Sequence, residues 1–566
     1  MPAATNAPGA LGKLLGAATD EWRATPFYRM MLRGADPDRI MQWGKDPRVG
    51  DGDHGAEIVA GTWRIASERL NGNNLFPWSA PPPSPHFSAR LHSFSWLRDV
   101  AALGPTAREC IAMQILSWVS GFGEWHPQAW APELVAERLF AWLCHGKPAF
   151  EGGDPVMRPA LMRSFGRQAR HLHLAAGDLR EPNARIKAGA VLTMVGCAGV
   201  PESERFLDLG LAMLGEACAA QFSPDGAHLS RAPENLCEAL CDMIAADDAL
   251  VRHAIETPAP VRETMVRMAG MLRFLRMGDG GLACFQGGGE GVPATIDRAF
   301  AEFEGAQRPF TVAPQSGYHR LEAGPVILII DAGTAPPAGF GDRAHAGCLS
   351  FEWSSGPDRL VVNVGASLEL APEWRVAGRA TNGHSTLVLD DALSAEFEQP
   401  RLGRGPARPV GPPHVTAKRT DDEEGAWIEA QHDGYRAAYG LIHRRTIYVD
   451  KAGRDIRGLD SLSRPVTQSR ASDPWRPPFT IRFHLHPKVQ AEVVEKGTAV
   501  LAAPNGEKWR LRTDAARMRI EDSVYLGHGD GPQRTRQIVL LGNAEPNGAG
   551  DAPPNRVRWA FSRLDG

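Results

Sequence analysis

GDGGLACFQGGGEG, residues 278–291, separates two stretches of the chain whose apolar residues follow different patterns. Before this segment, apolar residues recur every three or four positions, which is the spacing of one helix face. After it, short runs rich in β-branched and aromatic residues alternate with Gly, Pro and Asp, which is typical of strands and turns. The change predicts a helical domain over residues 1–300 and a β domain over residues 301–566.

Several segments of the first half show the helical spacing. In VRETMVRMAGMLRFLRMG, residues 261–278, the apolar side chains of Val261, Met265, Met268 and Leu272 fall on one face. AWAPELVAERLFAWLCHG, residues 129–146, has the same spacing. Breaks that contain Pro and Gly separate these segments, so we expect many helices joined by short links and packed as antiparallel pairs.

The second half contains regularly spaced strand-like runs such as PVILIIDAG, CLSFEWSSG and RVRWAFSRL. Short strands with turn signals between them predict an antiparallel β-sandwich. The glycine-rich segment between the halves lacks a following Lys-Ser or Lys-Thr, so it is interpreted as a loop or linker rather than a phosphate-binding loop. A cleft between two such domains is where a ligand site is expected.

Composition excludes several classes of function. The 62 basic and 66 acidic residues give a net charge of −4, which offers no general attraction for nucleic acid or an anionic membrane. The eight cysteines form no zinc-ribbon pattern and are expected to be buried free thiols. No secretory signal and no apolar run long enough to span a bilayer are visible. We therefore expect a cytoplasmic protein, or a periplasmic one if a leader is missing.

Two segments of the helical half carry candidate site residues. Asn183 stands just before an apolar helix, where it could cap the helix or hydrogen-bond a substrate carboxylate. In SPDGAHLSRAPENLCEAL, residues 223–240, His228 and Arg231 precede another helix. A histidine and an arginine are unexpected there because a helix N-terminus favours anions, so this position would suit a bound carboxylate.

The β half adds a second group of candidates. Tyr318 opens the first long strand-like run. His345, Asn363 and His384 follow in order, and two histidines with an oxygen ligand could hold zinc if folding brings them together. Spacing alone gives this metal site weak support, and His345 could equally be an ordinary polar residue where a loop enters a sheet.

Eight segments, in this order, resemble the heparinase II/III family of polysaccharide lyases. They are LHSFSWLRDV, AWAPELVAERLFAWL, NARIKAGAVL, DGAHLSRAP, SGYHRLEAG, AHAGCLSFE, LVVNVGA and HSTLVLDD. The resemblance covers most of the chain. It implies an N-terminal (α/α) toroid, usually incomplete, followed by an antiparallel β-sandwich, which agrees with the change of pattern at residues 278–291.

The resemblance also implies a chemistry, β-elimination at a uronic acid. In the family an Asn neutralises the sugar carboxylate, a Tyr or His removes the C5 proton, and an acid protonates the leaving oxygen. Asn183 matches the neutralising position. On this basis the catalytic candidates are Asn183, His228, Tyr318 and Arg343, and an arginine near Tyr318 would lower the pKa of that base. The substrate-binding candidates are Arg231, Asn235 and Arg379.

The chain departs from the family pattern at five positions. Ala184 stands where many members have His, and Asn235 stands where many have the catalytic Tyr. Arg343 and Gly347 replace a His and an Asp of the metal-binding pattern, and Asn363 replaces an Asp. The metal candidates are therefore His345, Asn363 and His384, for one zinc ion or another divalent cation.

These observations lead to a first hypothesis and two alternatives. The first is a polysaccharide lyase-like enzyme that cleaves an acidic, uronate-containing polysaccharide or oligosaccharide by β-elimination between the domains. The second is a non-catalytic glycan-binding or exopolysaccharide-associated protein on the same scaffold. The third is a glycan hydrolase that would use two facing carboxylates, such as Asp225 and Glu234. The expected partner is an acidic glycan, without nucleic acid or a membrane span, and the chain could form a homodimer.

Overall fold

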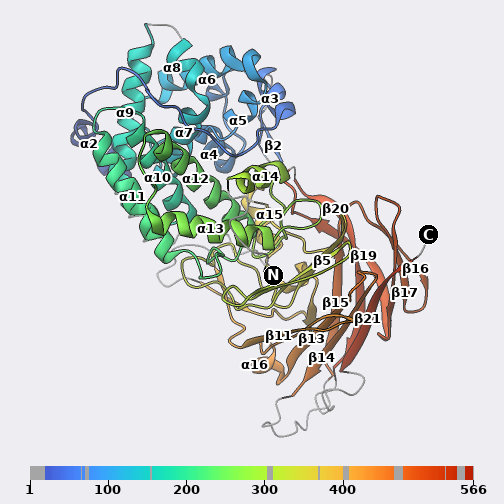
Figure 1. Ribbon diagram of the computed structural model, residues 1–566. Coiled ribbons are helices and arrows are strands. Elements are labelled where there is room, and N and C mark those ends of the chain that lie inside the picture. Colours follow the sequence, from blue (N-terminus) through green and yellow to red (C-terminus); the bar gives the residue numbers. More distant parts are fainter. Residues whose placement is uncertain are drawn as a thin grey trace.

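A computed structural model shows a helical part followed by a β part, which confirms the predicted fold class (Figure 1). The structure describes residues 19–65, 67–70, 75–152, 156–302, 310–367, 370–399, 407–464, 476–529, 531–544 and 555–564. The last helix before the sandwich ends at Ala301, and the first strand of the sandwich begins at Val312. None of the described helices combines the length and apolar character needed to cross a lipid bilayer.

The helices stack mainly as antiparallel neighbours and end against the sandwich. The α-helices of this part are α2 Pro26–Met31, α3 Gly52–Val59, α4 Pro85–Ser93, α5 Leu97–Ala101, α6 Arg108–Phe122, α7 Pro132–His145, α8 Lys147–Gly152, α9 Arg158–Ala175, α10 Pro182–Cys197, α11 Ser203–Ala220, α12 Pro233–Arg252, α13 Ala259–Phe274 and α14 Pro293–Ala301. Short 3-10 turns lie at η1 Pro77–Ser79, η2 Gly104–Ala107 and η3 Ala176–Asp178, and a small hairpin joins β1 Arg64–Ile65 to β2 Glu68–Arg69.

Helix α10 lies at the centre of this part. A proline begins it, and the Glu181 side chain accepts a hydrogen bond of 2.6 Å from the Ala184 amide, so both signals expected at a helix start are present. From Ile186 to Cys197 every residue is buried. Helix α11 packs closely on it because Gly210 has no side chain. A Cβ there would lie 2.5 Å from the Thr193 amide nitrogen.

The β part consists of two large antiparallel sheets. The eight-stranded sheet has the order β11-β12-β13-β14-β21-β18-β17-β16, and the nine-stranded sheet has the order β19-β20-β15-β7-β6-β5-β4-β3, with β8 paired to β15. The strands are β3 Val312–Ala313, β4 Tyr318–Ala323, β5 Val326–Asp331, β6 Phe351–Ser355, β7 Asp358–Val362, β8 Leu387–Leu389, β11 Val415–Asp421, β12 Gly425–His432, β13 Ile442–Asp450, β14 Asp455–Ser463, β15 Pro478–Leu485, β16 Gln490–Glu495, β17 Thr498–Ala502, β18 Lys508–Thr513, β19 Arg517–Tyr525, β20 Gln533–Asn543 and β21 Arg556–Leu564.

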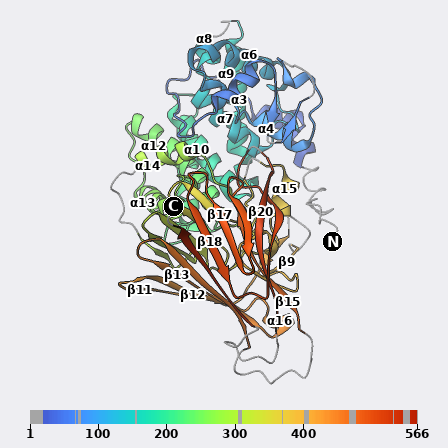
Figure 2. The same ribbon diagram turned by 90° about the vertical axis from the view of Figure 1, so that its right-hand side faces the viewer.

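Smaller elements lie around the sheets. They are the hairpin of β9 Glu396–Glu398 with β10 Arg408–Val410, the helices α15 Pro372–Ala377 and α16 Arg436–Tyr439, and the turn η4 Thr381–Gly383. Figure 2 shows the two sheets from the side, with the helical part covering one end of the sandwich.

Large aromatic side chains fill the space between the two sheets. Trp353 packs edge-on against Trp509 with 4.8 Å between ring centroids, and Phe351 stacks on Trp559 at 5.5 Å. Trp509 on β18 and Trp559 on β21 alternate with more exposed residues, as in a half-buried sheet, whereas every residue of β6 is buried. All eight cysteines are free thiols and seven of them are buried, which confirms the prediction from their surroundings.

The glycine-rich segment 278–291 is a loop, and it is packed between the two parts rather than exposed as a linker. Its residues 281–289 are all buried. A Cβ at Gly287 would lie 2.3 Å from the Arg343 carbonyl oxygen, and one at Gly289 would lie 2.5 Å from the Gly527 carbonyl oxygen. The glycines are therefore explained by the close approach of backbone from the sandwich.

Candidate functional site

The candidate residues lie where the first turns of α10 and α12 meet one end of the nine-stranded sheet. Asn183 is on the first turn of α10, and Arg231 and Asn235 flank the start of α12. Tyr318 begins β4, while His345 and His384 lie on loops that cover the end of the sheet. The glycine-rich segment contributes Gln286, which touches both groups.

A chain of hydrogen bonds joins three of the helical candidates. The Asn183 amide donates to the Asn235 carbonyl oxygen at 3.0 Å, and the Asn235 amide donates to the Ser230 hydroxyl at 3.1 Å. The Ser230 hydroxyl and its backbone amide both donate to Nδ1 of His228, at 2.7 and 3.2 Å. His228 thus carries its proton on Nε2, which faces the Gln221 side-chain oxygen at 3.4 Å.

Arg231 ties the start of α12 to the sandwich. Its guanidinium donates to the carbonyl oxygens of Ser316 and Thr334, both at 2.8 Å, and pairs with the Asp331 carboxylate. Arg231 adopts a positive φ of 58°, a backbone conformation that is uncommon for residues other than glycine. It is 8% exposed, so its guanidinium interacts with groups inside the protein rather than with solvent.

Tyr318 lies beside this arginine. Its hydroxyl donates to the Arg231 carbonyl oxygen at 2.5 Å, and the Arg231 guanidinium lies 4.9 Å from the centre of its ring. The tyrosine is 0% exposed. The predicted effect of the arginine on this side chain is present but outweighed, because burial raises the pKa of Tyr318 well above its ordinary value.

Asp331 and Gln286 connect the arginine to the histidine pair. The Gln286 amide donates to Asp331 at 2.6 Å, and its oxygen accepts from the His345 backbone amide at 3.2 Å. His384 donates from Nδ1 to the Ala380 carbonyl oxygen at 2.9 Å, so its Nε2 is the acceptor for Nδ1 of His345 at 3.0 Å. The hydrogen bonds therefore link Asn183, His228 and Asn235 in one group, and Arg231, His345 and His384 in a second that lies against it.

Burial keeps these histidines neutral. Desolvation lowers the pKa of His228 to about 3 and that of His384 to about 4, and it holds the pKa of His345 well below the ordinary value. At neutral pH none of the three carries a positive charge that could bind a carboxylate.

Asn363 does not join the two histidines. Its backbone amide and side-chain amide both donate to one oxygen of Glu352, at 2.8 and 3.2 Å, and its own side-chain oxygen accepts from the Ser385 amide at 3.0 Å. These hydrogen bonds are all made within the sandwich.

The predicted metal set does not fit a divalent cation in this arrangement. Both ring nitrogens of His384 are used, and a Cβ on Gly347, where family members have Asp, would lie 2.5 Å from the His384 ring. Among the residues that the structure describes, no three His, Cys, Asp or Glu side chains gather closely enough to hold a metal ion. The zinc site remains a prediction from the sequence.

The two remaining candidates lie on the covering loops. Arg343 is half-buried, and its charge opposes the burial that raises the pKa of neighbouring Asp342. Arg379 is buried and donates to the carbonyl oxygens of Ala344 at 2.9 Å and Ala407 at 2.7 Å. It holds the loop around His345 in place.

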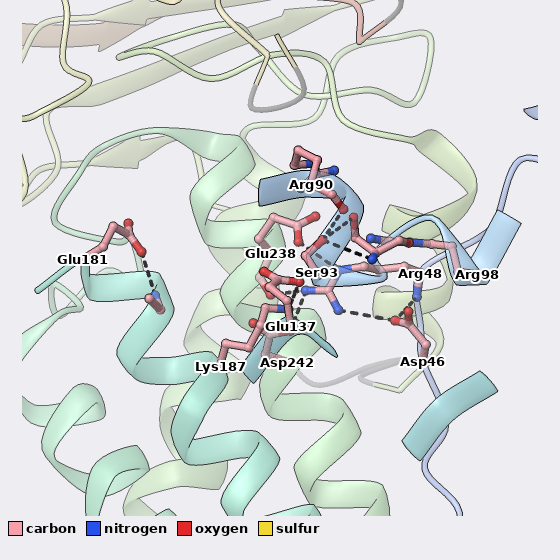
Figure 3. A network of polar contacts seen from close by, with 12 residues as sticks. Asp46, Arg48, Arg90, Ser93, Arg98, Glu137, Glu181, Lys187, Glu238 and Asp242 are labelled. Atoms are coloured by element: carbon pink, nitrogen blue, oxygen red, sulfur yellow. Dashed lines mark hydrogen bonds and ion pairs between the residues drawn. The ribbon is translucent and has the colours of Figure 1, made fainter. Parts of the chain in front are cut away.

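The helical part also contains a buried ion cluster that is not predicted from the sequence (Figure 3). Arg48 binds Glu238 at 2.9 Å and Asp242 at 2.6 Å, and Lys187 binds the same Asp242 oxygen at 2.7 Å. Asp46 lies 3.3 Å from Arg48 and closes the cluster. Lys187 is one turn after Asn183 on α10, and a lysine at this apolar position is the signal that the sequence offers.

This cluster borders a cavity of about 10 Å³, which has room for roughly one water molecule. The cluster fixes the segment before α3 against α10 and α12, and each of its two cations lies against a carboxylate. We assign it a structural role, because removing one partner from such a cluster would leave an uncompensated buried charge.

Comparison with known proteins places the chain in a family. Residues 305–560 match the family model described as heparinase II/III-like, C-terminal. The chain is 32% identical over 563 residues to FtsZ-localized protein C of Caulobacter vibrioides (strain NA1000 / CB15N), and the match covers 97% of this chain and 95% of that one.

Solved structures share the fold at low identity. Heparinase III superposes with a TM-score of 0.70 at 12% identity over 98% of this chain and 90% of its own. Heparan sulfate lyase HepC from Pedobacter heparinus gives a TM-score of 0.56 at 14% identity over 97% and 88% of the two chains. The family model, the full-length relative and the fold agree, and the chain belongs to the heparinase II/III family.

Proposed function

We propose that this chain is a non-catalytic, glycan-binding member of the heparinase II/III family that acts at assemblies of FtsZ. The fold is that of a polysaccharide lyase, but the groups that would perform β-elimination are engaged within the protein. The proposal thus follows the second of the hypotheses drawn from the sequence.

The observation that carries this proposal is the position of Tyr318. A base for β-elimination must reach the C5 proton of the sugar within hydrogen-bond distance. The Tyr318 hydroxyl instead donates to the Arg231 carbonyl oxygen at 2.5 Å, and no part of the side chain is exposed. Its raised pKa further disfavours the phenolate that would accept the proton.

The other elimination groups are engaged in similar ways. Nδ1 of His228 already receives two hydrogen bonds, so it has no free lone pair for a substrate proton. The Asn183 amide group, which would neutralise the carboxylate, donates to the Asn235 carbonyl oxygen. Arg231 pairs its charge with Asp331. Each of these groups would have to leave a protein partner before it could meet a sugar.

The place of action is proposed from the full-length relative. That protein is named for its localisation to FtsZ, and it matches this chain over almost its whole length. A binding role at that location needs the heparinase fold but no free catalytic groups. The candidate side chains that are hydrogen-bonded within the protein are consistent with such a role.

Two measurements test this proposal. Purified protein, incubated with uronate polysaccharides, is expected to give no absorbance from an unsaturated product, with heparinase III on heparan sulfate as the positive control. A fluorescent fusion is expected to follow FtsZ in dividing cells. Elimination by the wild-type protein on any of these substrates, or a uniform distribution of the fusion, would overturn the proposal.

A second candidate is β-elimination of an acidic glycan by a rearranged site. It is favoured by two buried atoms, Oδ1 of Asn183 and Nε2 of His345, which accept no hydrogen bond from the residues that the structure describes. Such orphan acceptors are uncommon in buried sites and often mark a ligand position. If the wild-type protein eliminates, the N183A variant is expected to lose that activity at least about a hundredfold while keeping its thermal midpoint.

A further inference from the structure

The outer face of the eight-stranded sheet has a hollow that shares no residue with the candidate site. Its volume is about 570 Å³, a size typical of small-molecule sites. Its lining includes Trp427, Thr446, Leu459, Arg512, Asp514 and Arg558. These residues come from β12, β13, β14, β21 and β18, which are neighbouring strands in Figures 1 and 2, and from the residue that follows β18.

The strand register explains why these side chains gather. Across the sheet, Trp427 pairs with Tyr448, Tyr448 with Arg457, Arg457 with Ala560, and Ala560 with Arg512. Directly paired residues point to the same face of an antiparallel sheet. A single row therefore runs from an aromatic side chain to an arginine, over roughly 19 Å for four strand spacings of about 4.8 Å each.

The next row of the same face supplies the floor of the hollow. Thr446 pairs with Leu459, and Leu459 pairs with Arg558. Small or apolar side chains, Ala560 and Leu459, thus lie between Trp427 on one side and two arginines on the other. The floor is apolar and the far wall is cationic.

Trp427 offers a flat apolar surface at one wall. It is 39% exposed although it is a large aromatic residue, and it packs on Tyr448 with 4.3 Å between ring centroids. Arg457 lies over the other ring of this pair, 5.7 Å from the centre of Tyr448. The tryptophan is therefore held in place with one face available.

The opposite wall carries unused positive charge. Arg457 pairs with Asp455, but the exposed guanidinium groups of Arg512 and Arg558 meet no acceptor among the residues that the structure describes. Asp514 is the acidic lining residue, and one of its oxygens accepts from the Arg558 backbone amide at 2.7 Å. Arginine groups of this kind bind carboxylates and sulfates through paired hydrogen bonds.

We propose that this hollow binds an acidic oligosaccharide. The hydrocarbon face of one sugar ring lies on Trp427 and Leu459, and a carboxylate or sulfate on a neighbouring unit pairs with Arg512 and Arg558. The inference rests on the proposed function only for the class of ligand, since it uses none of the residues near Tyr318.

Charge and shape favour this ligand over two others. An extended peptide binds a sheet at an unpaired edge, whereas the hollow lies over five central and paired strands. A lipid surface is bound by protruding apolar and basic groups, whereas the apolar floor here is recessed. An apolar ring face that carries anionic substituents matches both walls.

Calorimetric titration of the full chain tests the site. Oligogalacturonate is the probe, a malto-oligosaccharide of equal length is the neutral control, and polyglutamate and anionic phosphatidylglycerol vesicles test the other ligand classes. The R512Q/R558Q variant is expected to bind oligogalacturonate at least about tenfold more weakly, since hydrogen bonds to charged groups are lost. W427A is expected to weaken binding too.

Arg444→Gln is the matched control. Arg444 is an exposed arginine on the outer face of β13 that contacts Gln431 and does not line the hollow, so R444Q is expected to bind as the wild type does. The inference is overturned if R512Q/R558Q, with an unchanged thermal midpoint, binds oligogalacturonate as tightly as the wild type. It is also overturned if the neutral sugar, polyglutamate or the vesicles bind through the same arginines and oligogalacturonate does not.

Failure of this inference and failure of the proposed function give different results. An unsaturated product from oligogalacturonate would contradict a non-catalytic role, and it would leave the comparison of R512Q/R558Q with R444Q unaffected. Loss of the arginine effect would contradict the outer-face site and would leave the elimination assay unaffected.

Discussion

Tyr318 shows how the hydroxyl of a catalytic candidate can instead serve the fold. The hydrogen bond from its hydroxyl to the Arg231 carbonyl oxygen supports the left-handed backbone at that arginine. Net contributions of buried hydrogen bonds are about 1 kcal/mol, and a buried carbonyl left without a partner costs about 1–3 kcal/mol.

We therefore expect the Y318F variant to lower the free energy of unfolding by about 1–3 kcal/mol, measured by urea titration. Y435F is the matched control, because the Tyr435 hydroxyl also donates to a buried carbonyl oxygen, that of Leu387 at 2.9 Å. A similar loss in both variants indicates a structural role for Tyr318. A Y318F protein of wild-type stability that has lost a measurable elimination activity would contradict it.

The sequence predicts some of these residues and cannot predict others. His345 and His384 are identified by their order in the family pattern, and they do hydrogen-bond each other. Asp331 and Gln286 are not, because they stand in LIIDAG and CFQGGG, where nothing marks them as partners. Their roles come from tertiary contacts between segments 45 residues apart. The same holds for Asn363, whose partner Glu352 has no mark in the sequence.

At the scale of elements, alternation of apolar residues identifies the strands that bury one face, such as β13 and β21. It misses β14, whose sequence DIRGLDSLS has a glycine and an aspartate on its inner face. A Cβ at Gly458 would lie 2.0 Å from the Trp559 ring, and Asp460 accepts hydrogen bonds from Arg445, His443 and Trp559. The strand is thus specified by partners on other strands, which its own sequence does not reveal.

Helix packing gives a prediction at this scale, because α11 has two glycines in different surroundings. Gly210 faces α10, and a Cβ added there would lie 2.5 Å from the Thr193 amide nitrogen, whereas a Cβ at Gly215 would meet nothing within 4 Å. Alanine favours a helix over glycine by about 1 kcal/mol.

We expect G215A to raise the free energy of unfolding by about 0.5–1 kcal/mol. G210A is expected to lower it by about 1–3 kcal/mol, because the added methyl group forces α11 away from the α10 backbone. Urea titration of the two variants against the wild type measures both changes. Equal gains in both would mean that α10 and α11 are not packed as closely as described.

At the scale of the whole molecule, both the helical part and the sandwich contain buried histidines that are neutral in the folded protein. Burial lowers the pKa to about 3 for His171, His228 and His484, and to about 4 for His92, His319 and His384. They lie in both the helical part and the sandwich. Buried carboxyls with a raised pKa act in the opposite direction, above all Glu352, whose pKa burial raises to about 7.

These shifts fix the sign of the pH dependence. Below the ordinary histidine pKa of about 6.5, these side chains become protonated in the unfolded chain but stay neutral in the folded one. The free energy of unfolding therefore decreases as pH falls toward the folded-state pKa values. Each histidine contributes about 1.4 kcal/mol per pH unit in this window. Between about pH 7 and pH 4.5, Glu352 offsets the contribution of about one histidine, because the folded state holds the Glu352 proton more tightly than the unfolded chain does.

We therefore expect the free energy of unfolding to be highest near pH 7 and to fall steeply toward pH 5, well before most carboxylates titrate. Since a domain is stable by only about 5–15 kcal/mol, a few such groups are sufficient to unfold it in this range. Urea titrations at stepped pH measure the slope. The H228Q variant is expected to reduce the slope of the free energy of unfolding against pH by the equivalent of about one proton. The same substitution at the exposed residue His253 is the control. A stability that stays constant from pH 7 to pH 5 would mean that these histidines are not buried as described, and the same finding would reopen His228 as a group able to exchange a proton with substrate.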